Sequence, residues 1–468
     1  MEKQQIGAPA CKESRGSDDD TLGQVLDVSV TPEEEKMVVR RLDMVLIPLM
    51  GICYMMQYMD KLALTQATLF GLRQDLNLVD AEYSWASAVF YFGYFAWSWP
   101  SSYLMVRLPL AKYSSVCILI WGGVLMCHAA TRNFGGFMAA RFFLGVGEAS
   151  IAPGFSLIIS MFYKREEQPS RQAAWFFGNC ISNLVSGVIA YGIGNLDIHT
   201  ITSWQLLFLF LDRNIAHHRV LKSRSGVNEG GVFKWDQAWL ALRDPQTWFL
   251  VLYTFAVNLC NGGLTSFSGI IINGFGFGTL ESLLMQMPLG AAQIVFLIIT
   301  SGIASRVANT RVLMMIINTA TAMVGIVLVW KLDQSNQRGR LTGLALAAVF
   351  AVNIPLSLSL ITSNVAGFTK RSTTSGLLFV AYCVGNIVGP QLFFSSEEPY
   401  YSTGMTASVA GLALGVLFLI CLLVYYIWEN RRRDAKYGVP TDMSELEAIA
   451  EGLSDKTDLE ITNFRYVL

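Results

Sequence analysis

One cation and one carboxylate stand inside an apolar run of the sequence that is long enough to cross a membrane, at about 137–162. Arg141 and Glu148 are seven residues apart, so an α-helix would place them on the same face about two turns apart. Ionisable side chains at membrane depth are costly and usually face a bundle interior or an aqueous cavity. This helix is therefore a candidate element of a pathway through the membrane, with Arg141 as a candidate partner for an anion and Glu148 as a candidate proton carrier. The alternative is that Arg141 snorkels to the membrane surface and that Glu148 is structural.

A second pair of opposite charges, Asp60 and Lys61, lies at the end of the first apolar run. A buried carboxyl beside a cation can exchange a proton near ambient pH, and a buried cation can hold an anion. Asp60 is therefore a second candidate for carrying a proton, and Lys61 is a second candidate for binding an anion. An interfacial ion pair is an equally good interpretation, because charged side chains at helix ends commonly snorkel.

Polar side chains also recur at helical spacing in the later apolar runs. Side chains that share a helix face could line a hydrogen-bonding cavity. They could instead bond neighbouring helices together, which in membranes contributes about 0.6–2 kcal/mol per bond. The candidates for the cavity are Asn179, Asn183, Asn258, Asn261, Asn353, Tyr382 and Asn386.

The composition predicts the kind of element that positions these residues. Of the 468 residues, 53% are hydrophobic and only 15% are charged, and the mean hydropathy is +0.43. Soluble chains of this length are usually more charged, so these values predict an all-α polytopic membrane protein in contact with lipid. The net charge of −1 offers no basic surface, and we expect no nucleic-acid partner.

Cysteine and histidine usage argues against a metal site or a disulfide framework. The eight cysteines are scattered, and the four histidines have no ligand spacing. The sequence also contains neither a nucleophile elbow nor a phosphate loop. We therefore expect no enzyme, no metal and no cofactor.

Apolar runs of about 20 residues recur along the chain, and each is long enough to cross the hydrocarbon layer. Between residues 194 and 246 the only apolar run is 204–211. As a helix this run would be about 12 Å long against a hydrocarbon core of about 30 Å, so it cannot span unaided. We place eleven full spans at about 43–63, 84–105, 112–131, 137–162, 172–194, 246–267, 281–304, 311–331, 341–364, 373–394 and 403–428.

The charges of the loops give an independent count of the crossings. Lys and Arg are distributed among the loops in a way that fits twelve crossings with both termini in the cytosol, by the positive-inside rule. This fit requires a crossing between residues 195 and 213. We therefore predict a sixth span that has lost much of its length, through a deletion, an alternative splice or a wrong exon junction near Leu211. A re-entrant or thinned short helix is the alternative.

Two groups of six helices joined by a polar connection suggest a transporter with its site between the halves. The predicted parts are an acidic cytosolic tail at 1–41, a first transmembrane half with the shortened sixth span at 42–211, a central cytosolic loop at 212–245, a second transmembrane half at 246–428 and a cytosolic tail at 429–468.

Two short basic loops, 106–112 and 302–311, are similarly placed in the two halves. Here the sequence resembles the major facilitator superfamily, whose signature loop at that position is Gly-x-x-x-Asp-Arg-x-Gly-Arg-Arg. Both copies depart from it, because the first lacks the acidic residue and the second has Ser305 where Asp is usual. A conformational latch is attributed to this loop in the superfamily. Neither copy here has the acidic residue of that latch.

Several strings in a fixed order resemble the fungal allantoate permease family over about residues 40–468. They are Tyr58-Met-Asp-Lys61, Arg141-Phe-Phe-Leu-Gly-Val-Gly-Glu-Ala149, Asn261-Gly-Gly-Leu264 with Gly274-Phe-Gly-Phe277, Gly385-Asn-Ile-Val-Gly-Pro-Gln-Leu392, and Asn463-Phe-Arg-Tyr-Val-Leu468. The resemblance implies proton-coupled symport of a small organic anion, such as a carboxylate, a vitamin or a ureido acid, by alternating access. We expect a monomer in the plasma membrane.

Two other interpretations stay open at this point. The chain could export a fungal secondary metabolite, which would need a wider and more apolar cavity. It could also be a transport-inactive truncated member of the family, if the shortened sixth span leaves the bundle incomplete.

Overall fold

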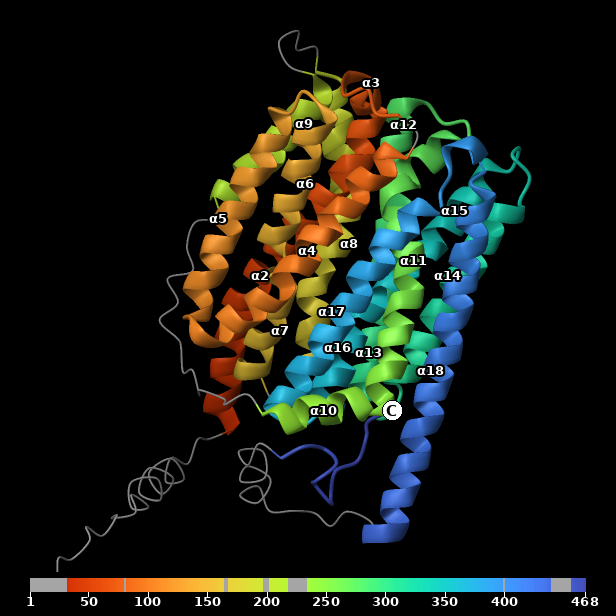
Figure 1. Ribbon diagram of the computed structural model, residues 1–468. Coiled ribbons are helices and arrows are strands. Elements are labelled where there is room, and N and C mark those ends of the chain that lie inside the picture. Colours follow the sequence, from red (N-terminus) through yellow and green to blue (C-terminus); the bar gives the residue numbers. More distant parts are fainter. Residues whose placement is uncertain are drawn as a thin grey trace, which may run out of the picture. The chain divides into compact units, whose positions relative to one another are not determined.

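The structure is a computed structural model, shown in Figure 1, and it describes residues 32–79, 81–163, 167–196, 202–217, 234–398, 400–438 and 456–468. All regular elements in these ranges are helices, as predicted. The contacts divide the chain into two units, Met1–Pro48 and Leu49–Leu468. The packing described below lies within the second unit.

The helices form two successive groups on either side of the central connection. The first group contains α2 (Pro32–Leu69), α3 (Leu72–Asp75), α4 (Glu82–Arg107), α5 (Leu110–Ala129), α6 (Phe134–Glu148), α7 (Ile151–Phe162), α8 (Gln168–Gly194) and α9 (Ser203–His217). After the short helix α10 (Trp235–Arg243), the second group contains α11 (Pro245–Asn273), α12 (Thr279–Leu284), α13 (Met287–Arg306), α14 (Arg311–Lys331), α15 (Gln337–Ala347), η1 (Ala348–Val352), α16 (Asn353–Asn364), α17 (Phe368–Gln391), η2 (Ser395–Glu397) and α18 (Ser402–Tyr437).

Nine segments of the described chain are long and apolar enough to cross a membrane. They coincide with nine of the eleven predicted spans, which confirms the polytopic architecture. The first two predicted spans, 43–63 and 84–105, lie inside α2 and α4, which are not among these nine segments. Several Tyr and Ser side chains lower the hydropathy of α4 without interrupting the helix.

Three of the spans are interrupted, and a proline follows each interruption. α6 gives way to α7 after Glu148, α12 gives way to α13, and η1 separates α15 from α16. Pro153, Pro288 and Pro355 lie in the first turns of α7, α13 and α16. Proline lacks an amide hydrogen, so it fits the first turn of a helix but not its interior. The first interruption places Glu148 at the end of a helix within the bundle.

Helix α9 occupies the place of the predicted sixth span. It has 15 residues. At 1.5 Å per residue this is about 22 Å, which is longer than the apolar run 204–211 suggests but shorter than a hydrocarbon core of about 30 Å. α9 continues past the predicted end of the first half at residue 211. Residues 218–233 of the predicted central loop lie outside the described residues.

Aromatic side chains attach α9 to its neighbours. The indole of Trp204 donates a hydrogen bond to Asp75 Oδ2 (2.7 Å), and Phe208 stacks on the buried ring of His128 with the ring centres 5.1 Å apart. Gln205 donates to the backbone carbonyl of Ala129 (3.0 Å). The short helix is therefore held by specific contacts to α3 and α5.

Helices α4 and α6 approach so closely that their glycines cannot carry a side chain. A Cβ on Gly145 would overlap the backbone carbonyl of Phe90, and a Cβ on Gly93 would overlap that of Phe142. Small residues permit this approach between membrane helices, whose association depends on van der Waals packing. The contact fixes α6, and with it Glu148, against α4.

We expect the substitution Gly145→Ala to destabilise the protein by about 1–3 kcal/mol, the usual cost of overpacking a core. The matched control is Gly123→Ala on α5, where an added Cβ meets nothing within 4 Å. That control should be neutral or slightly stabilising, because Ala is the better helix former. Thermal unfolding of the two purified variants in one detergent measures both effects, and equal unfolding temperatures would contradict the expectation.

The two groups of helices meet at one end of the bundle, the end with α3 and α12 at the top of Figure 1. The hydroxyl of Tyr83 donates to the backbone carbonyl of Ser266, and the hydroxyls of Ser87 and Ser266 bond each other. The amide of Gly269 donates to Thr65 Oγ1 (3.3 Å). Helix α4 also packs against α17, and α8 packs against α13. The halves are therefore closed against each other at this end.

Candidate site in the central cleft

Asp60 and Lys61 lie inside α2, well before its end at Leu69. Asp60 is fully buried, and the side chain of Lys61 is only 10% exposed. An interfacial pair would need to lie at the helix end, where its side chains could reach the membrane surface. The observed burial instead places both charges within the bundle.

Lys61 points to the carboxyl group of Glu148, the last residue of α6. Its Nζ lies 3.2 Å from Glu148 Oε2. Gln57, one turn earlier on α2, donates from Nε2 to the same oxygen (2.9 Å). Residues four apart on a helix share a face, so α2 presents a cation and an amide donor together to one carboxylate.

Asp60 is bonded to α5 and lies next to Glu148. The indole Nε1 of Trp121 donates to Asp60 Oδ2. The carboxyl groups of Asp60 and Glu148 are within reach of a hydrogen bond with each other. Asp60 Oδ1 and Glu148 Oε1 are buried and have no donor among the described residues. One proton shared between the two carboxyls would supply that donor and relieve the repulsion of two buried like charges.

Arg141 is 3% exposed, so it does not snorkel to the surface. Its guanidinium interacts electrostatically with both Asp60 and Glu148 and lies over the ring of Phe137, 5.9 Å from the ring centre. Its Nε has no hydrogen-bond partner among the described residues. Arg141 and Glu148 therefore both face the bundle interior, as predicted from their spacing.

A cavity lies between the two halves and holds about 870 Å³ of empty space, including its open mouth. Lys61 is the one charged residue among the described residues that line it, and Gln57 lines it beside Lys61. Glu148 and Asp60 are not in the lining and lie behind these two. Of the predicted binding residues, Lys61, Asn258, Asn261, Asn353 and Tyr382 line the cavity, whereas Arg141, Asn179, Asn183 and Asn386 do not.

Two of the amides that lie outside the cavity, Asn386 and Asn183, connect helices. Asn386 donates to Asn258 Oδ1 (2.9 Å) and accepts from Asn261 Nδ2 (2.7 Å), so it holds the two lining amides in place. Asn183 on α8 donates to Gln293 Oε1 on α13 (2.9 Å) and so joins the halves. Some of the predicted polar residues thus line the cavity, whereas others bond neighbouring helices together.

Sequence reasoning missed several residues of the lining. Gln57 could have been found, because it precedes Lys61 by one helical turn and is polar in an apolar run. Aromatic residues such as Tyr94 and Phe379 could not, because aromatic side chains occur throughout the spans and carry no positional signal. The aromatic residues of the lining that were missed are Tyr54, Tyr94, Tyr253, Phe350 and Phe379.

A cleft between two helical halves, with ionisable groups at its centre, is the architecture of a secondary transporter. Residues 50–390 match the family model of the Major Facilitator Superfamily, and the chain belongs to that superfamily. The protein is therefore a multi-pass membrane transporter of a small molecule and not an enzyme.

Two relatives place the chain more narrowly. It is 34% identical to an uncharacterized transporter of Schizosaccharomyces pombe, over 94% of this chain and 89% of that protein. It is 32% identical to the allantoate permease of Saccharomyces cerevisiae, over 94% of this chain and 88% of that protein. The resemblance to the fungal allantoate permease family is thereby confirmed.

The fold is also similar to that of a solved structure. The crystal structure of a bacterial homologue of the human lysosomal transporter Spinster, inward-facing and occupied, aligns over 82% of this chain and 96% of that chain. The TM-score is 0.55 at 14% sequence identity, so this similarity bears on the fold alone.

Proposed function

We propose that the protein carries a small organic anion together with a proton across the membrane by alternating access between its two halves. The observation that carries the proposal is the buried carboxyl pair of Asp60 and Glu148 directly behind Lys61, the charged residue of the cavity. The pair can hold a proton, and Lys61 can hold an anion.

The charges of this group link the proton to the anion. Asp60, Lys61, Arg141 and Glu148 are all buried or nearly so. Their net charge is zero when both carboxyls are ionised and +1 when the two carboxyls hold one proton. An anion beside Lys61 therefore favours protonation, and protonation favours the anion, since such coupling is reciprocal. In a low-dielectric site this attraction is stronger than in water.

The neutral polar groups of the lining suit a cargo that carries hydrogen-bonding groups besides its charge. Asn258, Asn261 and Asn353 offer amides, and Tyr253 and Tyr382 offer hydroxyls. A carboxylate with urea or amide groups would use both kinds of partner. The allantoate permease among the relatives supports a ureido acid as the first compound to test, with other carboxylates and vitamins next. An apolar metabolite for export would use neither the charge of Lys61 nor these polar groups.

We further propose a monomer in the plasma membrane with both termini in the cytosol. The loop charges support this orientation. Because α2 ends near the closed end of the bundle, that end would then face the outside. Alternating access would require the contacts of Tyr83, Ser87 and Ser266 to separate when the outer end opens.

We expect cells that produce this protein to take up radiolabelled allantoate or another small organic acid in a saturable way. Uptake should rise as the outer medium is acidified and should collapse with a protonophore, because the proton gradient drives it. Cells with an empty vector give the background, and surface labelling shows how much protein is present. Saturable uptake that ignores both external pH and the protonophore would contradict proton coupling.

The short helix α9 supports a second candidate, a transport-inactive member of the family. Its 15 residues reach about 22 Å against a core of about 30 Å. Its contacts through Trp204 and Phe208 are compatible with a folded bundle in either case. Normal surface levels without uptake of any small organic acid in the same assay would favour this candidate over the symporter.

A further inference from the structure

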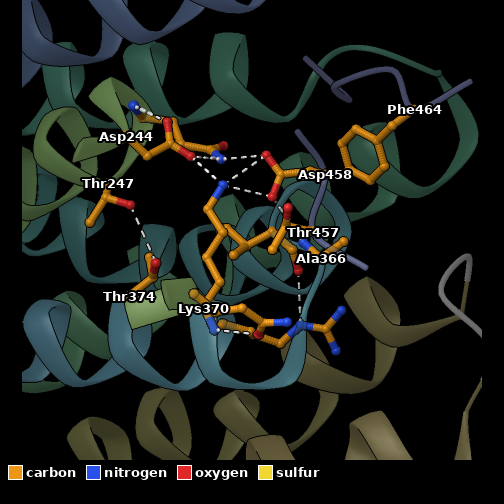
Figure 2. A network of polar contacts seen from close by, with 12 residues as sticks. Asp244, Thr247, Ala366, Lys370, Thr374, Thr457, Asp458 and Phe464 are labelled. Carbon is orange, nitrogen blue, oxygen red and sulfur yellow. Dashed lines mark hydrogen bonds and ion pairs between the residues drawn. The ribbon is translucent and has the colours of Figure 1, made fainter. Parts of the chain in front are cut away.

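The described chain closes with a segment, residues 456–468, that folds back onto one end of the second half. We call this segment the C-terminal strap. It contains the string Asn463-Phe-Arg-Tyr-Val-Leu468, which the proposed transport chemistry does not use. Its Asp458 is fully buried and bonds the fully buried Lys370, as Figure 2 shows.

The strap supplies one of two carboxylates to a buried lysine. Lys370, in the first turn of α17, is fully buried. Its Nζ lies 2.6 Å from Asp244 Oδ2 and 2.7 Å from Asp458 Oδ1. Asp244 caps the start of α11 by accepting from the amide of Gln246 (3.1 Å), whereas Asp458 belongs to the strap. The ion pairs thus join two helix ends to the strap.

Asp458 is itself held by several partners. The hydroxyl of Tyr466 donates to its Oδ2 (2.8 Å), and Arg433 Nη1 on α18 donates to its backbone carbonyl (2.8 Å). The amide of Ala366 donates to its Oδ1 (3.3 Å). Breaking a buried ion pair by removing one partner is strongly destabilising, because an uncompensated charge remains. These contacts of Asp458 therefore hold the strap against the second half.

The end of the strap forms paired hydrogen bonds with further helices. Asn430 on α18 donates to the carbonyl of Tyr466 (2.8 Å) and accepts from its amide (2.9 Å). Asn364, at the end of α16, makes the same two bonds with Val467, both at 2.8 Å. The amide of Arg311, at the start of α14, donates to the carbonyl of Leu468 (2.9 Å).

The helices that the strap joins all belong to one half. They are α11, α14, α16, α17 and α18, and the strap contacts given above include no described residue of the first half. A helix that moved independently of the others would have to break these buried bonds. The strap is therefore placed to hold the helices of the second half together, and we call this role a clamp.

We propose that the C-terminal strap stays seated throughout the transport cycle and makes the second half move as one rigid body. Alternating access by rocking requires each half to keep its internal packing while the interface between the halves changes. The proposal rests on the proposed alternating access, but its test needs no cargo, so it can fail independently of the substrate assignment.

The first test measures whether Asp458 holds the strap. Phe464 is 9% exposed, so the substitution Phe464→Cys places a shielded reporter in the strap. The purified full chain is treated with a maleimide, and labelling at residue 464 is followed by peptide mass spectrometry. Asp458→Asn should raise the labelling rate about tenfold or more, because it removes a charged partner of Lys370. Tyr466→Phe should raise it less.

The matched control is Thr462→Ala, an exposed position of the strap, which should leave the labelling rate unchanged. Equal labelling in the reporter chain and in both Asp458→Asn and Tyr466→Phe would overturn the proposal. If Asp458→Asn does not yield folded protein, Tyr466→Phe still decides the question, since it removes a single hydroxyl.

The second test asks whether the strap stays seated while the halves move. Ser87 and Ser266 bond each other across the closed end, so Ser87→Cys with Ser266→Cys can be joined by a disulfide that locks the halves. The clamp predicts the same slow labelling at residue 464 with the disulfide formed and with it reduced. Faster labelling after reduction would mean that the strap leaves its seat during the cycle, which would make it a gate and not a clamp.

Discussion

The substitution Glu148→Gln should reduce proton-driven uptake to the background of cells without the protein. Gln keeps the size of Glu and an oxygen that can accept from Gln57, but it can neither release nor take up a proton. It mimics the protonated carboxyl permanently. The group of charges behind the cavity therefore stays positive, and the halves cannot return without the anion.

The same argument predicts what Glu148→Gln retains. Anion binding should persist and should no longer depend on pH, so exchange of labelled for unlabelled cargo across the membrane should continue. The matched control is Glu398→Gln, which neutralises an exposed carboxylate near η2 and should leave uptake unchanged. Net uptake near the normal level in Glu148→Gln would remove Glu148 from the proton pathway.

The substitution Lys61→Met should abolish anion binding and should also destabilise the protein. It removes the charge of the cavity lining and leaves Glu148 without its ion-pair partner at 3.2 Å. Breaking a buried pair on one side costs about 3–5 kcal/mol. We expect a lower unfolding temperature in detergent and uptake at background. Lys112→Met, which removes an exposed cation at the start of α5, is the matched control.

The double variant Lys61→Met with Glu148→Gln separates the two effects of Lys61. Removing both partners leaves no uncompensated charge, so the unfolding temperature should recover toward that of the unmodified protein. Uptake should stay at background, because neither the anion ligand nor the proton carrier is present. Stability that does not recover would show that Lys61 contributes through other contacts than Glu148.

Much of the fold could be predicted from the sequence, because hydropathy is a local property of each helix. Nine predicted spans coincide with nine apolar helical segments. The full length of α2 could not be predicted, since Asp60 and Lys61 interrupt the apolar run although the helix continues to Leu69. The helix continues there because other helices, and not lipid, surround these side chains.

Some residues of the candidate site could be predicted from the sequence, but their layout could not. Helical periodicity placed Arg141 and Glu148 on one face, and both are buried. It could not tell that Lys61 lines the cavity while Arg141 lies outside the lining, because that depends on how α2 and α6 pack. The contacts of the strap could not be predicted either, because they depend on tertiary packing: Lys370 and Asp458 are 88 residues apart in the sequence.

The most direct test measures whether protons enter together with the anion. The account holds that the carboxyl pair behind Lys61 couples proton movement to anion movement. The purified protein is placed in liposomes that contain a pH-sensitive dye, and a transported anion is added outside without any other gradient. The unmodified chain should acidify the lumen as the anion enters, and Glu148→Gln should not. Anion entry without acidification in the unmodified chain would contradict the account.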